Sequence, residues 1–279
     1  MRNTLERTVV VGVDAGGSSM AAVDFAAAEA ELRGLPLLLL SAHPTPSEDG
    51  PRTTLTAILR RVRTTWPELT TTAHNVTGEA AETLIDASRT ATLLVIGRRE
   101  PDGAPVPGPV GAQVVAHSRC PTLVVPADTP VPTEGPVMLG FGMSPEDEPA
   151  IAFAFEEAAL RRMPLLAVHV WSGIPDTAVG TISPFAYDLY EAQAAADRIL
   201  AEALAGWGDK HPDVKADRMP LYDVNPARTL LEASTLASLV VVSARRHARR
   251  SSHLLGTVTR TLIQHAPRPV AVIRPTHRT

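Results

Sequence analysis

The stretch that decides the fold is "VVVGVDAGGSSMAAVDFAAAEAELRGLPLLLLSA", residues 9–42, because the chain contains this pattern twice. It aligns without a gap on "VMLGFGMSPEDEPAIAFAFEEAALRRMPLLAVHV", residues 137–170, at a constant separation of 128 residues. Each copy reads as an apolar strand, an Ala-rich amphipathic helix and a second apolar strand. The sequence therefore predicts an internal repeat of one α/β unit.

The repeat continues with a changing separation. "DASRTATLLVIGRR" (86–99) aligns on "EASTLASLVVVSARR" (232–246) at a separation of 146, so the second copy carries 18 extra residues, which we place around residues 172–192. Pro121 then aligns on Pro269 at a separation of 148. The first copy is thus two residues shorter just before its last helix.

Each copy alternates five strands with four helices, which is typical of parallel βαβ units with right-handed crossovers. The fourth strands, "TLLVIG" and "LVVVS", are apolar on both faces, as strands covered by helices on both sides should be. Between the copies, "PADTPVPTEGP" (126–136) has linker composition. We predict an α/β protein of two tandem, open, mostly parallel five-stranded Rossmann-like domains, residues 1–132 and 133–279.

Composition narrows the class of protein. The 279 residues are 44% hydrophobic and 20% charged, which is typical of a soluble globular protein. A net charge of −4 argues against a nucleic-acid-binding protein. Cys120 is the single cysteine and has no partner for an internal disulfide, and no apolar run approaches the length of a membrane span. We expect a cytoplasmic protein that binds neither nucleic acid nor membrane.

Ligands of open parallel sheets bind beyond the carboxyl ends of the strands. In the first copy, Asp14 follows the first strand and precedes "AGGSS" (15–19). Its carboxylate could accept hydrogen bonds from ribose hydroxyls or hold a cation; the alternative is a helix N-terminal signal. The second copy has Gly142 at this position and its first carboxylate only at Glu146, so that ligand oxygen is missing.

After the fourth strand, the second copy offers Ser243, Arg246, Gly256 and Thr257 in the spacing S-x2-R-x9-G-T. Loop amides, a helix N-terminus and arginines together can form a phosphate cradle. A solvated basic loop followed by a Thr-capped helix explains the same residues. The sequence leaves both interpretations open.

The first copy departs from this pattern. It reads Gly97, Arg98 and later Glu100, followed by Gly108 and Pro109 in the positions of Gly and Thr. Proline fits a first helical turn but supplies neither a hydroxyl nor an amide proton to a phosphate. The first loop therefore lacks a hydroxyl and an amide proton with which the second loop could bind an anion.

Signatures of catalysis are absent. The chain has no G-x-S-x-G, no G-x-x-x-x-G-K-[ST] and no H-E-x-x-H. His43 and His169 are placed at matching ends of the second strands, and equivalent positions in both repeats favour a structural role over a catalytic one. His247 and His253 have no carboxylate or thiol near them in sequence for metal binding. We predict no catalytic residue and no metal ligand.

These motifs together resemble the tandem form of the universal stress protein family, over nearly the whole chain. Members carry an Asp at the tip of the first strand, and those that bind ATP carry G-x2-G-x9-G followed by Ser or Thr. Asp14, Gly97 and Gly108 match in the first copy, and Gly256 and Thr257 match in the second. Glu100, Gly142, Ser243 and Arg246 depart from the pattern, so neither site is complete.

By the same resemblance, adenine would lie between the end of the second strand and the segment after the third. The positions are Ala42 and Val76 in the first copy, and Val170 and Tyr222 in the second. The complete set of expected nucleotide contacts follows from the loops and these positions: Asp14, Ala15, Ala42, Val76, Gly97, Arg98, Gly108, Val170, Tyr222, Ser243, Arg246, Gly256 and Thr257.

The resemblance implies a non-catalytic stress-response regulator with degenerate pockets for an adenine nucleotide, ATP with Mg. Because backbone and helix-terminus contacts dominate phosphate affinity, the second copy is favoured as the binding half. The alternative is an interaction module with lapsed ATP sites. The family also pairs domains through their fifth strands, here "TLVVPAD" (122–128) and "VAVIRP" (270–275), which implies an internal pseudo-dimer or self-association.

Overall fold

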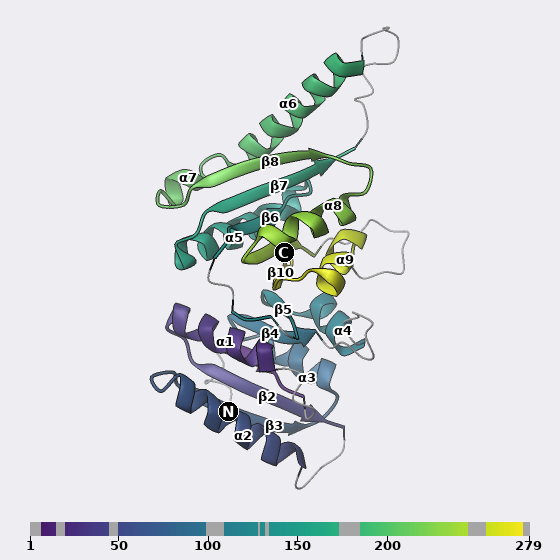
Figure 1. The fold of residues 1–279 in the computed structure, drawn as a ribbon. Coiled ribbons are helices and arrows are strands. Elements are labelled where there is room, and N and C mark those ends of the chain that lie inside the picture. Colours follow the sequence, from purple (N-terminus) through teal and green to yellow (C-terminus); the bar gives the residue numbers. More distant parts are fainter. Residues whose placement is uncertain are drawn as a thin grey trace.

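The computed structural model shows how the two copies are assembled (Figure 1). It describes residues 7–14, 20–44, 50–98, 109–127, 129–131, 134–172, 185–244 and 255–275. Ala15, Gly108 and Arg246, three of the expected nucleotide contacts, lie outside these residues.

The first copy forms the predicted alternation of strands and helices. Its elements, in chain order, are β1 (Val9–Gly12), α1 (Met20–Arg33), β2 (Leu37–His43), α2 (Gly50–Thr65), β3 (Thr71–Thr77), α3 (Ala80–Ala87), β4 (Leu93–Arg98), α4 (Pro109–His117) and β5 (Thr122–Pro126). Pro109 is the first residue of α4, the position in which a missing amide proton costs nothing.

The second copy repeats this order with short additions. Its elements are β6 (Val137–Gly140), the 3-10 turn η1 (Pro145–Asp147), α5 (Glu148–Arg161), β7 (Leu165–Trp171), α6 (Phe185–Leu204), α7 (Trp207–Lys210), β8 (Ala216–Tyr222), α8 (Pro226–Ala233), the 3-10 turn η3 (Ser234–Leu236), β9 (Leu239–Ser243), α9 (Thr257–His265) and β10 (Val270–Ile273).

All ten strands belong to one sheet, in the order β3-β2-β1-β4-β5-β10-β9-β6-β7-β8. Within each half the strand pairs are parallel, which confirms the predicted fold class. The halves meet where β5 and β10 pair antiparallel, with Val124 opposite Val270. The fifth strands thus pair within the chain, as the family resemblance implied.

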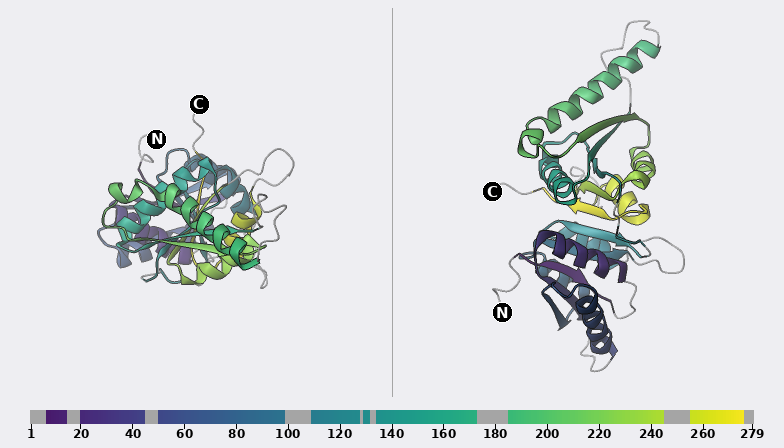
Figure 2. Two further views of the ribbon diagram at one scale, coloured as in Figure 1. Left: turned by 90° about the horizontal axis from the view of Figure 1, so that it is seen from above. Right: turned by 60° about the vertical axis from the view of Figure 1, so that its left-hand side comes forward.

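Helices cover both faces of the sheet (Figures 1 and 2). Buried residues of α1, α2, α5 and α6 form one core with the strand residues beneath them, and those of α3, α4, α8 and α9 form a second core on the opposite face. Because the strands are covered on both sides, residues such as Val9, Val10 and Val11 are all fully buried. Each core runs through both halves of the molecule.

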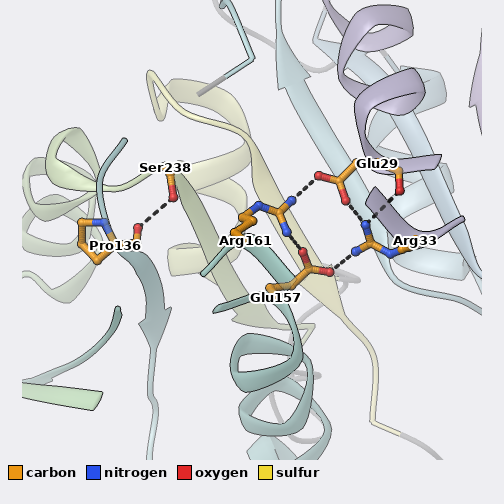
Figure 3. A network of polar contacts seen from close by, with 6 residues as sticks. All are labelled: Glu29, Arg33, Pro136, Glu157, Arg161 and Ser238. Atoms are coloured by element: carbon orange, nitrogen blue, oxygen red, sulfur yellow. Dashed lines mark hydrogen bonds and ion pairs between the residues drawn. The ribbon is translucent and has the colours of Figure 1, made fainter. Parts of the chain in front are cut away.

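A ring of four charges joins the halves on the face of α1 and α5 (Figure 3). Arg33 and Arg161 each donate to both Glu29 and Glu157, so that every carboxylate meets both guanidinium groups. The side chains are nearly buried, with Glu157 only 2% exposed. Burial lowers the pKa of the Arg161 guanidinium, and the charge of Glu29 opposes that shift.

Two further arginines tie the halves on the other face. Arg98, at the end of β4, donates to the Ala266 carbonyl at the end of α9 over 2.7 Å. Arg274, after β10, donates to the Ala116 carbonyl near the end of α4. Cations suit helix C-termini, whose last carbonyls lack partners within the helix. The two copies are therefore joined by strand pairing and by charged contacts on both faces.

Candidate functional site

The candidate site in each half lies at the topological switch point of the sheet. In the first half β1 pairs with β2 on one side and β4 on the other, and in the second half β6 pairs with β7 and β9. The crossovers leave these central strands in opposite directions, which opens a crevice beyond their carboxyl ends. The tips to compare are therefore those of β1 and β4 with those of β6 and β9.

In the second half, a buried carboxylate holds these tips together. Asp147, only 1% exposed, accepts a hydrogen bond from the Ser243 hydroxyl at the end of β9 over 2.6 Å. Its other carboxylate oxygen accepts from the backbone amides of Gly142 and Ser144, each over 3.1 Å. One side chain thus takes up donors from both strand tips.

Local sequence explains how Asp147 reaches this place. Ser144 caps η1 by accepting a hydrogen bond from the Glu146 amide, and Pro145 fits the first position of that turn. Asp147 then directly precedes α5, where the helix dipole and the unpaired amides of the first turn favour a negative charge. A carboxylate here needs no ligand to be stable.

The contacts of Asp147 affect which donors remain to bind an anion. Amides and hydroxyls at a helix N-terminus are the groups with which such crevices bind anions. Near the strand tips of this half, two amides and one hydroxyl are already bonded to Asp147. The negative charge of Asp147 also disfavours a second anion close to these donors.

Sequence reasoning missed Asp147, because the alignment drew attention to the position of Asp14. Asp147 lies 128 residues after Ser19, a polar residue that reads only as a helix cap. The first half has Gly97 where the second has Ser243, and glycine offers no hydroxyl to a carboxylate. Two differences between the copies could have indicated Asp147. The second copy has Gly142 in place of Asp14, and it has Ser243 in place of Gly97.

The first half places its predicted strand-tip residues as expected, as far as it is described. Asp14 follows β1 and is partly buried, and it takes part in polar interactions there. Gly97 lies one residue before the end of β4, the strand that pairs with β1. These two residues therefore lie near the carboxyl ends of two paired strands.

Arg98 does not lie in that crevice. Its side chain is 6% exposed and is bonded to the Ala266 carbonyl of the other half. An arginine used in this way holds two domains together, so Arg98 is a structural residue in this conformation. The prediction of Arg98 as a nucleotide contact has no support from its position.

The start of α9 has the form of an anion-binding helix end. Gly256 is the N-cap residue, with an extended backbone and no side-chain cap, and the exposed Thr257 begins the helix. Thr259 lies two residues further and donates its hydroxyl to the Ser243 carbonyl over 3.1 Å, which fixes α9 to β9. At this helix start Gly256 is buried and Thr257 is exposed, so the start of α9 is open to solvent at Thr257.

The expected adenine positions differ between the halves. Ala42 and Val76 are direct neighbours in the pairing of β2 with β3, so their side chains share a face of the sheet. In the second half Val170 pairs with Leu221, whereas Tyr222 pairs with Trp171 and packs against its ring at 4.8 Å. Val170 and Tyr222 therefore lie on opposite faces and cannot flank one ring.

His247 and His253 lie outside the described residues. The prediction that His43 and His169 occupy equivalent positions is wrong, because Trp171 lies 128 residues after His43. His43 ends β2 and bonds to the Ser41 hydroxyl over 3.0 Å, whereas His169 lies two residues before the end of β7 and bonds to the Phe141 carbonyl over 3.0 Å. Both contacts are structural. In the described part of the chain, no three His, Cys, Asp or Glu side chains are placed to hold a metal ion.

The fold defines a tandem Rossmann-like protein with a topological switch point in each half. Known proteins narrow this class. The model of the universal stress protein family matches residues 6–126 and again 135–274. This chain belongs to the universal stress protein family, as a tandem member.

Individual relatives agree with this assignment. A universal stress protein of Mycobacterium tuberculosis is 32% identical over 290 residues, which cover 95% of this chain and 96% of the relative. One of Mycolicibacterium smegmatis is 32% identical over 298 residues and 99% of each chain. The crystal structure of a universal stress protein from Archaeoglobus fulgidus has the same fold, with a TM-score of 0.65 at 14% identity over 98% of this chain and 99% of that one.

None of the helices in the described ranges is both long and apolar enough to cross a membrane.

Proposed function

We propose that this universal stress protein is a non-catalytic, cytoplasmic stress-response regulator in which an adenine nucleotide binds in the first half alone. The observation that carries the proposal is the buried Asp147 carboxylate of the second half, bonded to Ser243 and to two amides of the β6–α5 connection. An internal anion with three donors competes with phosphate for the same groups.

The first half supports the proposal because it has different residues at its strand tips. Asp14 stands at the tip of β1, and Gly97 stands where the second half has the serine that bonds Asp147. Ala42 and Val76 share one face beside this tip, as an adenine site requires. This assignment reverses the preference for the second half that the Gly256–Thr257 spacing suggested from sequence.

Titration calorimetry with Mg-ATP tests the proposal. Wild-type protein should bind one nucleotide per chain, and Asp14→Ala should weaken binding by about 10-fold or more, since a hydrogen bond to a charged group contributes about 1.5–3 kcal/mol. Thr257→Val should leave the affinity unchanged. Loss of binding in Thr257→Val with normal binding in Asp14→Ala would overturn the assignment to the first half.

A second candidate function is an interaction module that binds no nucleotide. The position of Arg98 favours it, because this predicted phosphate contact is instead bonded to Ala266. Absence of heat with Mg-ATP from folded wild-type protein supports this candidate and excludes the nucleotide-regulated one.

A further inference from the structure

A cavity of about 530 Å³ lies in the second half, on the face covered by α5 and α6. Its walls come from the β6–α5 connection, the first turns of α5, the last turns of α6 and the start of α7. Cavities of this size are typical of small-molecule sites. Its lining shares Ser144 with the contacts of Asp147 and includes none of Ser243, Gly256 and Thr257.

The cavity lies beside the C-terminal part of α6. Ala192, Ala196 and Leu200 are buried at intervals of one turn, so this part of α6 packs on the sheet. The last turns of α6 line the cavity opposite the first turns of α5, and we call this space between the two helices the wedge. The N-terminal part of α6 extends beyond the sheet and does not contribute to the lining (Figures 1 and 2).

Apolar side chains form most of the wedge. They are Phe141, Pro145, Ile151, Ile199, Ala203 and Trp207. Trp207 is held rigidly, because its ring stacks on Phe155 at 5.8 Å. At the rim, Met143 is 51% exposed and has a φ of 67°, a strained conformation for a residue other than glycine. The wedge is therefore an apolar surface that stays open to solvent.

Two carboxylates complete the lining, Glu148 from α5 and Glu202 from α6. Neither has an ion-pair partner among the described residues. Lys210, which touches the lining through Trp207, has its ammonium group over that ring at 4.1 Å. The lining thus carries two negative charges and no cation of its own.

We propose that this wedge binds a small organic cation, a primary amine with an apolar or aromatic body. The apolar walls would cover the body, while Glu148 and Glu202, on opposite helices, would receive the ammonium group. A carboxylate or phosphate ligand would meet two like charges, and a neutral ligand would gain nothing from them. This inference does not depend on nucleotide binding by either half.

Calorimetry with three matched probes tests the charge requirement: 4-phenylbutylamine, its neutral N-acetyl derivative and the anion 4-phenylbutyrate. The amine should bind, the acetylated probe should bind at least threefold more weakly and the anion should show no binding. Raised salt should weaken the amine because the carboxylates are exposed. Equal affinities of the amine and its acetylated form, or no heat from the amine with folded protein, would overturn the proposal.

Variants locate the site. Glu202→Gln and Glu148→Gln should each weaken the amine by about two- to fivefold, the range of exposed ion pairs. Glu146→Gln is the matched control, since Glu146 is an exposed carboxylate of the same connection that does not line the wedge. Ala203→Leu should block the cavity and abolish binding. Equal weakening by Glu146→Gln, or full binding by Ala203→Leu, would show that the amine binds elsewhere.

Discussion

At the residue scale, the Asp147 carboxylate does for the second half what a bound anion does elsewhere in such folds. It joins the β6 tip to the β9 tip through Gly142, Ser144 and Ser243. The strand tips of this half are therefore joined by a charged side chain of the chain itself.

This role predicts a loss of stability on substitution. Asp147→Ala should lower the free energy of unfolding by about 1–3 kcal/mol, because the Ser243 hydroxyl and two amides lose a charged acceptor. Glu146→Ala is the control, since its side chain is exposed, and it should change stability by no more than about 0.5 kcal/mol. Denaturant unfolding measures both; equal effects of the two variants would contradict a special role of Asp147.

Cys120 gives a prediction about pH. Burial raises the pKa of the Cys120 thiol from 9.0 to about 11. As pH rises from 9 to 11, the unfolded chain loses this proton while the native chain keeps it, so stability should fall in that window. In Cys120→Ala that part of the decrease should be absent.

Thiol labelling provides an independent measurement for the same residue. At pH 8 a disulfide reagent should react with Cys120 in native protein far more slowly than with the unfolded chain, because the thiol is buried and protonated. Equal labelling rates would contradict the buried environment.

At the element scale, glycines near the ends of β1 and β6 show how tightly neighbouring strands and helices pack around the strand ends. A Cβ on Gly140 would lie 3.0 Å from a Val242 methyl group of the adjacent strand, whereas a Cβ on Gly12 would lie 3.1 Å from the end of the Leu84 side chain of α3. A β-branched valine has less freedom to move than the end of a leucine.

Alanine should therefore be worse in the second half. Gly140→Ala should cost about 1–3 kcal/mol of stability through overpacking, and Gly12→Ala should cost less because Leu84 can change rotamer. Thermal unfolding of the two variants makes the comparison, and a larger loss for Gly12→Ala would contradict this account of the packing.

The elements also show where prediction from sequence succeeds and where it stops. The alternation of strands and helices was predicted correctly, and strands such as β4 and β9 were distinctive because their apolar residues are covered on both faces. The edge strands β3 and β8 are largely polar and exposed, so their hydrophobic pattern is weak. The register of β8 was not predictable. Thr71 pairs with Leu37 and Ala216 with Leu165, so the third strands are 145 residues apart and not 146. A one-residue slip moves every side chain to the other face, which is why Tyr222 was misplaced.

The candidate site was less predictable than the fold for a related reason. Asp14 and Gly97 follow from their places at strand ends. The contacts of Asp147 and Arg98 depend on side-chain direction at a helix start and at the interface between halves, and periodicity contains no information about either. Such contacts could have been indicated only by residues that differ between the copies, such as Ser243 in place of Gly97.

At the scale of the whole molecule, the charge ring of Glu29, Arg33, Glu157 and Arg161 has the same composition from each half (Figure 3). Buried ion pairs of this kind often add little net stability, but removal of one member leaves uncompensated charge. We therefore expect the ring to fix how the halves pair.

Glu157→Gln should lower the free energy of unfolding by about 3–5 kcal/mol, since it leaves two buried guanidinium groups with one carboxylate. The exposed neighbour is the control, and Glu156→Gln should have an effect below about 0.5 kcal/mol. Equal stability of Glu157→Gln and wild type in denaturant unfolding would contradict a closed, buried ring.

The central claim is that the Asp147 carboxylate prevents nucleotide binding in the second half. A crystal structure of the wild-type chain grown with saturating Mg-ATP tests it most directly. We predict nucleotide density beyond β1 and β4, beside Asp14, with Asp147 still bonded to Ser243. Density beyond β6 and β9, with the Asp147 carboxylate displaced from Ser243, would contradict the account.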